Sequence, residues 1–238
     1  MIAPDSLRSP PSPRWILRHS AGVRITHWLN AIAFIFLVWS GAAILLAFPQ
    51  FHWGQAGYVG MDPALKLPLT LDTKYTTWAR PMHFSFAWLL VINGAVYILL
   101  GAISGHFRRD LLPERRQLHG RYLLDDIRRH LALRHSPDDA VGYNVLQRLA
   151  YLVVIFVLLP AMLLSGLAMS PTVVSAAPWL TDLFQGRQSA RFVHFIAASL
   201  LVAFLAIHLF QVVVAGASRQ VFSMLTGRVP AVEVVERD

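Results

Sequence analysis

Four histidines lie near the ends of the most apolar stretches of this 238-residue chain: His27, His83, His194 and His208. The last two share one stretch and are separated by 14 positions. In an α-helix that spacing puts them about 21 Å apart along the axis and about 40° apart around it. Both histidines would lie on the same face of that helix, one near each surface of a bilayer. Because ionisable side chains inside membrane helices are costly and mark functional sites, we expect two metal centres stacked across a membrane, with haem as the cofactor that fits best.

The composition is that of a membrane protein. The chain is 55% hydrophobic and 14% charged, with a mean hydropathy of +0.50, whereas a soluble domain carries about 25% charged residues. Four stretches, residues 26–48, 82–105, 144–170 and 192–217, are long enough to cross a hydrocarbon core of about 30 Å. We therefore expect an all-α, integral membrane four-helix bundle over residues 19–228. Residues 1–18, rich in Pro and Ser and without a signal-peptide core, and residues 229–238 are expected to be tails.

Positive charge is divided unevenly between the segments that connect these stretches. Of the 21 lysines and arginines, 15 precede the first stretch, lie between the second and third, or follow the fourth; 5 lie in the other two loops, and Arg148 lies in the third stretch. By the positive-inside rule, both termini and the middle loop face the cytoplasm. The net charge of +8 is thus a topology signal, and nucleic acid is not an expected partner.

The depth of each histidine decides which histidines can meet. With both termini inside, His27 and His208 lie at the cytoplasmic side, and His83 and His194 lie at the outer side. Each pair would supply two axial imidazoles to one haem iron, which suits electron transfer. The chain has no cysteine, and this excludes cysteine-ligated iron–sulfur clusters and covalently attached c-type haem. Zinc is a poor alternative, because the two pairs are too far apart to give four ligands to one ion.

An arginine stands three positions before three of the four histidines: Arg24, Arg80 and Arg191. Residues at i and i−3 share a helix face, and each arginine would lie one turn nearer to water. Haem propionates lie at that boundary, and arginine binds carboxylates well. We therefore expect these arginines to hold propionates. Taken singly, each histidine could also be an interfacial residue. Four glycines within the apolar stretches could serve helix packing or make room for a porphyrin: Gly41, Gly94, Gly101 and Gly166.

Other features lie outside this constellation. Residues 49–80 form the longest loop expected on the outer side, either a docking surface for a partner or a lid over the helix ends, and its aromatic residues, including Phe51, fit an interfacial belt. Residues 122–131 have the spacing of a basic amphipathic helix on an anionic membrane surface. Pro160 is expected to kink the third helix, because it removes a backbone hydrogen bond.

Three segments resemble a known family: residues 19–30 (HSAGVRITHWLN), 143–151 (YNVLQRLAY) and 165–171 (SGLAMSP). They are similar to bacterial di-haem cytochrome b subunits of formate dehydrogenase, thiosulfate reductase and nickel–iron hydrogenase, most of all the thiosulfate-reductase type. The resemblance extends from Arg18 to about Arg228 and includes the four histidines. It implies a quinone site beside the cytoplasmic haem, with Asn144 and Gln147 at the matching positions. An ordinary helix cap and an interhelical hydrogen bond would explain the same two residues.

These observations together predict a membrane subunit with two haems b. It would transfer electrons between the quinone or quinol pool and a periplasmic redox partner, which the resemblance implies is a molybdopterin oxidoreductase. The alternatives are a stand-alone cytochrome b that acts as a superoxide:quinone or ferric oxidoreductase, and a membrane anchor without haem.

Overall fold

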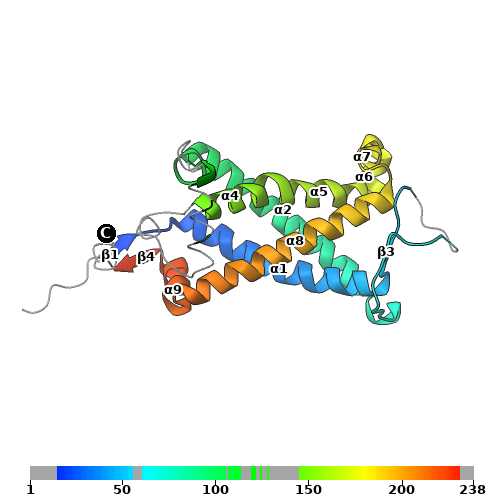
Figure 1. The fold of residues 1–238 in the computed structure, drawn as a ribbon, viewed down its shortest axis with the longest axis horizontal. Helices are drawn as coiled ribbons and strands as arrows, with labels where there is room; N and C mark the ends of the chain where they lie inside the picture. The colour runs from blue at the N-terminus through cyan, green and yellow to red at the C-terminus, as the bar shows by residue number, and fades with distance from the viewer. Residues whose placement is uncertain are drawn as a thin grey trace, which may run out of the picture.

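A computed structural model describes residues 15–55, 61–105, 107–113, 119–121, 124, 128 and 145–230. Four apolar helices long enough to cross a membrane dominate it: Ala21–Ala47, Ala79–Ser104, Val145–Ala168 and Arg187–Val214. The first two are α1 and α2, the third comprises α4, η5 and α5, and the fourth is α8. The chain is therefore an all-α membrane helical bundle, as predicted (Figure 1).

Two of the helices begin about five residues before the predicted apolar stretches. Helix α1 begins at Ala21, where the side chain of Ser20 caps it by accepting a hydrogen bond from the Val23 amide, at 3.4 Å. Helix α8 begins at Arg187, and a loop carbonyl accepts hydrogen bonds from its first turn. Hydropathy marks only the apolar part of a helix, whereas caps extend it into the polar interface.

The third membrane helix stays continuous through Pro160. Helix α4 (Val145–Val153) passes into a π-helical turn, η5 (Val154–Leu158), and then into α5 (Leu159–Ala168). Proline cannot donate the backbone hydrogen bond of an α-helix, and the structure places a wider π turn directly before it. The structure therefore shows a π turn before Pro160, and the kink of the helix stays a prediction.

The helices pack as two antiparallel pairs, α1 with α2 and α5 with α8. At one end of the bundle, α9 (Ala217–Thr226) follows α8, and strands β1 (Trp15–Leu17) and β4 (Arg228–Pro230) pair antiparallel. At the other end lie the short helices α6 (Pro171–Ala176) and α7 (Trp179–Leu183) and the hairpin of β2 (Gln50–Phe51) and β3 (Leu65–Lys66) (Figure 1). The described chain ends therefore lie together at one end.

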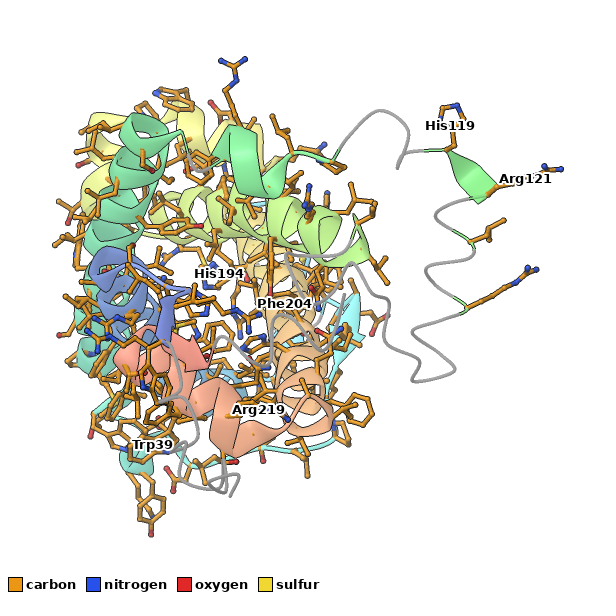
Figure 2. All side chains as sticks on the ribbon, turned by 90° about the vertical axis from the view of Figure 1, so that its left-hand side faces the viewer. Trp39, His119, Arg121, His194, Phe204 and Arg219 are labelled. Atoms are coloured by element: carbon orange, nitrogen blue, oxygen red, sulfur yellow. The ribbon has the colours of Figure 1, made fainter. Side chains whose placement is uncertain are left out.

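Small and hydroxyl-bearing side chains fill the contacts between helices, while large apolar ones face outward. In α1 the buried residues are Thr26, Ala33, Ser40 and Ala43. Trp39 is 56% exposed and lies at the periphery, whereas His194 and Phe204 lie among the helices (Figure 2). Small residues at the interface allow close helix approach in a lipid environment, where burial of large apolar side chains brings no hydrophobic gain.

The loop after α1 folds back onto the start of α8. Phe51 is 1% exposed, and its ring centre lies 4.6 Å from that of Phe195. The Gly54 carbonyl accepts a hydrogen bond from the Gln188 amide at 2.9 Å, and the Gly54 amide donates to Ser189 Oγ at 2.7 Å. The expectation that Phe51 belongs to an interfacial belt is wrong, because this ring packs against α8. The described part of the loop covers a helix end.

The remaining described elements are η1 (Thr73–Tyr75), before α2, and the π turn η2 (Phe107–Leu111), after it. Most of the predicted amphipathic segment 122–131 lies outside the described residues.

Candidate functional site

The four histidines form two pairs, one toward each end of the bundle. The ring centres of His27 in α1 and His208 in α8 are 6.4 Å apart, with an interplanar angle of 58°. Those of His83 in α2 and His194 in α8 are 6.3 Å apart, at 62°. Helix α8 thus contributes one histidine to each pair, and the structure brings together the partners that helix depth predicts.

The ring spacing can be compared with the requirements of one shared metal ion. An imidazole nitrogen lies about 2 Å from a metal ion that it ligates. The ring centre lies roughly 1.1 Å behind that nitrogen, given ring bonds close to the C–N length. Two rings in line on one ion would then have centres about 6.2 Å apart. Both pairs have this spacing, so each fits two axial ligands on opposite sides of one iron.

A Ser-Gly dipeptide contacts each histidine of the His83–His194 pair. Ser40 Oγ on α1 lies 3.0 Å from His83 Nδ1, and a Cβ placed on Gly41 would lie 3.4 Å from His83 Cε1. On α5 the same two relations join Ser165 and Gly166 to His194, at 3.0 Å and 3.4 Å. Each dipeptide therefore faces the Nδ1–Cε1 edge of an imidazole and leaves the Nε2 atom directed away from it.

The His27–His208 pair has different neighbours. Asn93 of α2 is buried and donates hydrogen bonds to the Thr26 carbonyl and to Asn30 Oδ1, both at 2.7 Å. These bonds hold the backbone of α1 directly beside His27. The Nδ1 atom of His27 is buried with no hydrogen-bond partner among the described residues. The support at this pair thus acts on the helix rather than on the imidazole.

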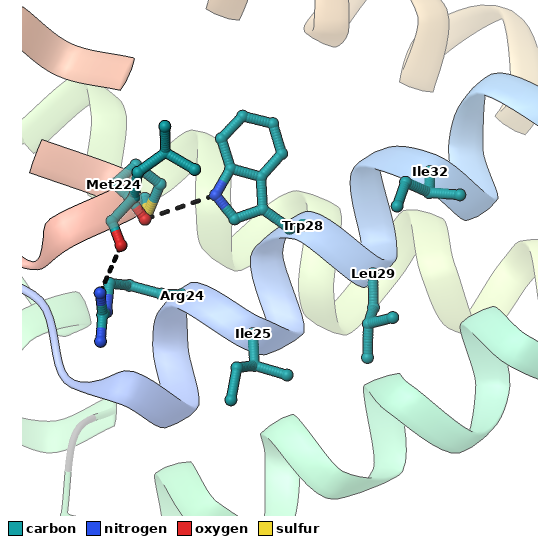
Figure 3. A pocket seen from close by; sticks show the side chains of 7 residues that line it. Arg24, Ile25, Trp28, Leu29, Ile32 and Met224 are labelled. Atoms are coloured by element: carbon teal, nitrogen blue, oxygen red, sulfur yellow. Dashed lines mark hydrogen bonds between the residues drawn. The ribbon is translucent and has the colours of Figure 1, made fainter. Parts of the chain in front are cut away.

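Arg24, one turn before His27, connects α1 to α9. Its Nη1 donates to the Leu225 carbonyl, and the Trp28 indole donates to the Met224 carbonyl at 3.3 Å (Figure 3). A shallow pocket between the two helices is lined by Arg24, Ile25, Trp28, Leu29, Ile32, Met224 and Leu225. Arg24 Nε is buried and has no partner among the described groups. The guanidinium therefore lies near His27 with donor capacity left over.

Arg80 and Arg191 lie at the end of the bundle that holds His83 and His194. The Arg191 guanidinium donates to the Gln50 carbonyl at 2.9 Å and to the Phe48 carbonyl, and it lies 5.0 Å from the centre of the Phe51 ring. The Arg80 guanidinium lies 5.7 Å from the centre of the Phe48 ring, close enough to Arg191 for mutual repulsion. The one salt bridge among the described residues joins Lys74 to Asp72. Two cations thus share this end and could bind a common anion.

Of the two residues matched to a quinone site, Asn144 lies outside the described residues. Gln147 lies in the first turn of α4 and is half-buried. Tyr151, one turn later on the same face, has its ring centre 6.1 Å from that of Phe204, which stacks on His208 at 6.2 Å and 15°. The face of α4 that carries Gln147 therefore continues to His208 through two aromatic rings.

The other histidines form no comparable pair in the described part of the chain. His19 precedes α1, and burial, together with the charge of Arg18, lowers its pKa to about 4. It is consequently neutral at pH 7. Its backbone amide donates to the Gly227 carbonyl at 3.2 Å.

Sequence analysis missed Ser40, Ser165 and Asn93. A signal for the two serines exists, because Ser-Gly occurs once in each of the first and third membrane helices, and each is followed by the pattern Ala-Arg-x-x-His-Phe at the start of the next one. The two copies of that pattern begin at Ala79 and Ala190, both fully buried. This internal repeat contains the whole His83–His194 site. Nothing comparable in the sequence singles out Asn93.

Comparison with known proteins places these features in a family. A family model described as prokaryotic cytochrome b561 matches residues 18–227. A relative from Azospira oryzae, named as a putative protein-methionine-sulfoxide reductase subunit YedZ1, is 34% identical over 209 residues, which cover 88% of this chain and 96% of the relative.

Two more distant relatives carry the name probable Ni/Fe-hydrogenase B-type cytochrome subunit. The one from Cupriavidus necator is 22% identical and covers 88% of this chain and 84% of its own length. The one from Bradyrhizobium diazoefficiens is 25% identical and covers 82% of this chain and 76% of its own length. The similarity spans the membrane helices and both histidine pairs.

Proposed function

The chain belongs to the prokaryotic cytochrome b561 family of haem b-binding, multi-pass proteins of the bacterial inner membrane, and from this premise we propose that it is a di-haem electron-transfer subunit. It would connect the quinone pool to a redox partner on the periplasmic side. The observation that carries this proposal is the presence of two histidine pairs at opposite ends of the bundle, each with ring centres 6.3–6.4 Å apart.

In this proposal, His27 and His208 hold one haem, and His83 and His194 hold the other. Haem iron with two axial imidazoles supplies one-electron transfer and leaves no open position for oxygen. The helix rise puts the two sites about 20 Å apart. In this arrangement the chain would orient the rings, and its guanidinium groups (Arg24, Arg80 and Arg191) would bind the carboxylates of the cofactor at the interface.

The quinone would bind beside the His27–His208 pair, with Asn144 and Gln147 as the polar groups that bind its carbonyls. The support for Gln147 is its place on the face of α4 that continues through Tyr151 and Phe204 to His208. A side-chain amide can donate a hydrogen bond to a quinone carbonyl. Quinol oxidation there would release two electrons and two protons, and the protons would leave to the adjacent aqueous side.

Both termini would face the cytoplasm, which puts the His83–His194 pair near the periplasm. The support is the division of 15 positive residues against 5 between the two sides. Reporter fusions after Arg116 and at the C-terminus should report the cytoplasm, and a fusion within residues 49–80 should report the periplasm. An inverted pattern would move the quinone site to the outer face.

The partner would be a periplasmic redox subunit, and we propose a molybdopterin oxidoreductase. The relatives named as subunits of a protein-methionine-sulfoxide reductase and of hydrogenases support a redox partner. Native purification should recover a stable complex, and metal analysis of that complex would then distinguish a molybdenum-containing partner from a nickel-containing one. A chain that purifies alone, and reduces ferric ions or oxidises superoxide by itself, would contradict the proposal.

The cofactor content is the most direct test. A pyridine haemochrome assay on the purified chain should give two haems b per polypeptide, both low-spin by absorption spectroscopy. One haem per chain would contradict the di-haem assignment. A chain without haem would reduce the protein to a membrane anchor.

A further inference from the structure

We propose that Ser40 and Ser165 are positioning residues for the His83–His194 pair: they set the tautomer and ring orientation of both imidazoles and lower the reduction potential of the haem held there. This inference rests on the proposed function, since it concerns a haem at this pair.

The hydrogen-bond geometry shows which atom donates. A serine hydroxyl carries a single proton. Ser40 Oγ lies 2.6 Å from the Phe36 carbonyl, which can only accept, so the hydroxyl proton points there. Ser165 Oγ has the same relation to the Ala161 carbonyl, also at 2.6 Å. With its proton engaged, each hydroxyl oxygen can only accept from the imidazole nitrogen 3.0 Å away.

The tautomer of both histidines follows from this direction. His83 and His194 must carry their proton on Nδ1, which leaves the Nε2 lone pair available to iron. The free nitrogen of each ring is therefore the one directed away from the Ser-Gly dipeptide.

The two glycines complete the arrangement. A Cβ at Gly41 or Gly166 would lie 3.4 Å from the Cε1 atom of the facing imidazole, already in van der Waals contact with the ring. The serine thus contacts the Nδ1 atom of each ring, and the glycine leaves room for the neighbouring Cε1 atom. Because the same dipeptide faces His83 from α1 and His194 from α5, the arrangement occurs twice, on two separate helix pairs.

An acceptor on the Nδ1 proton makes a ligating imidazole more basic. A more basic ligand stabilises ferric over ferrous iron and lowers the reduction potential. Loss of the hydroxyl should therefore raise the potential. His27 lacks such an acceptor among the described residues, so the effect should be confined to the haem of the His83–His194 pair.

The test uses Ser40→Ala and Ser165→Ala in the full chain, with Ser40→Thr and Ser165→Thr as conservative variants that keep a hydroxyl. Ser85→Ala in α2 and Ser199→Ala in α8 are matched controls. Each control removes a hydroxyl that bonds the carbonyl four residues earlier, at 2.9 Å, without contact to a paired histidine. The readouts are haem content, spectroelectrochemical titration and the low-spin EPR g-values, which respond to the orientation of the axial rings.

Each alanine variant should keep two haems and shift the reduction equilibrium of one haem threefold to tenfold toward the ferrous form, about 28–59 mV at 59 mV per tenfold for one electron. Its g-values should change, while the g-values and potentials of the threonine variants and the controls should stay near those of the parent.

An alanine variant that loses this haem is compared with the threonine variant at the same position. If the threonine variant binds the haem, the result supports the proposal; if both variants lose it, the proposal is overturned. Two bound haems with unchanged potentials and g-values overturn the role of the serines and leave the proposed function standing. A parent chain without two haems instead contradicts the proposed function.

Discussion

The two histidine pairs have almost the same ring spacing, yet the surrounding protein supports them differently. At His83 and His194, side chains from neighbouring helices contact the imidazoles directly through Ser40 and Ser165. At His27, Asn93 binds the backbone of α1 one residue away. The first arrangement orients a ring, and the second holds a helix in register. The two histidine pairs of one bundle therefore have different surroundings, with contacts to the imidazoles at one pair and a contact to the helix backbone at the other.

The largest expected effect comes from removing one ligand of each pair. His208→Ala should reduce the haem content from two to one and leave the His83–His194 haem, and His194→Ala should do the reverse. The reason is that the pairs lie at opposite ends of α8 and share no ligand. Pyridine haemochrome assays and redox titration of both variants make the measurement. Loss of both haems from either variant would show that the two sites do not form independently.

Filling the space beside the imidazoles should also act on one pair alone. Gly41→Val or Gly166→Val would push the facing ring from its place, because even a Cβ lies 3.4 Å from Cε1. Overpacking of this kind costs about 1–3 kcal/mol, and we expect weaker haem retention at the His83–His194 pair. Gly94→Val is the control, since a Cβ there meets nothing within 4 Å. Equal haem retention in all three variants would remove the glycines from the site.

Asn93→Ala should produce the complementary effect at the other pair. It removes two hydrogen bonds of 2.7 Å, one buried and one partly buried, and leaves the Asn30 side chain without this donor. A loss of about 1–3 kcal/mol in stability is expected, with a changed spectrum for the His27–His208 haem only. Thermal unfolding in detergent and haem-resolved redox spectra test this. A change confined to the His83–His194 haem would contradict the division of roles described above.

The smallest effects should come from the arginines. Removing a cation near a haem favours the more positive ferric state, so it should lower the midpoint potential. We expect modest decreases for Arg80→Gln and Arg191→Gln at the His83–His194 haem, and for Arg24→Gln at the other. Redox titration of each variant is the measurement. Unchanged potentials in all three, with haem fully bound, would leave Arg24 and Arg191 as anchors for the Leu225, Gln50 and Phe48 carbonyls, and Arg80 as a neighbour of the Phe48 ring.

Several details of the fold were not predictable, because they depend on contacts between distant segments. The start of α8 at Arg187 depends on the Gly54 carbonyl, which accepts from the amides of Gln188 and Ser189, 134 and 135 positions away in the chain. The burial of Phe51 depends on the same docking of the loop onto α8. Pro160 signals a backbone disturbance, but whether the helix breaks or widens into a π turn depends on the neighbouring helices.

The sequence by itself determined the class of the molecule and the depth of its histidines. Long apolar stretches specify spanning helices because an unpaired backbone is costly in lipid, and the regular helix rise converts spacing into position across the bilayer. Only the tertiary structure decided which face of each helix meets which neighbour. Hydropathy is almost uniform around a lipid-exposed helix, so the rotation that directs Ser40 at His83, Ser165 at His194 and Asn93 at Thr26 follows from packing between helices.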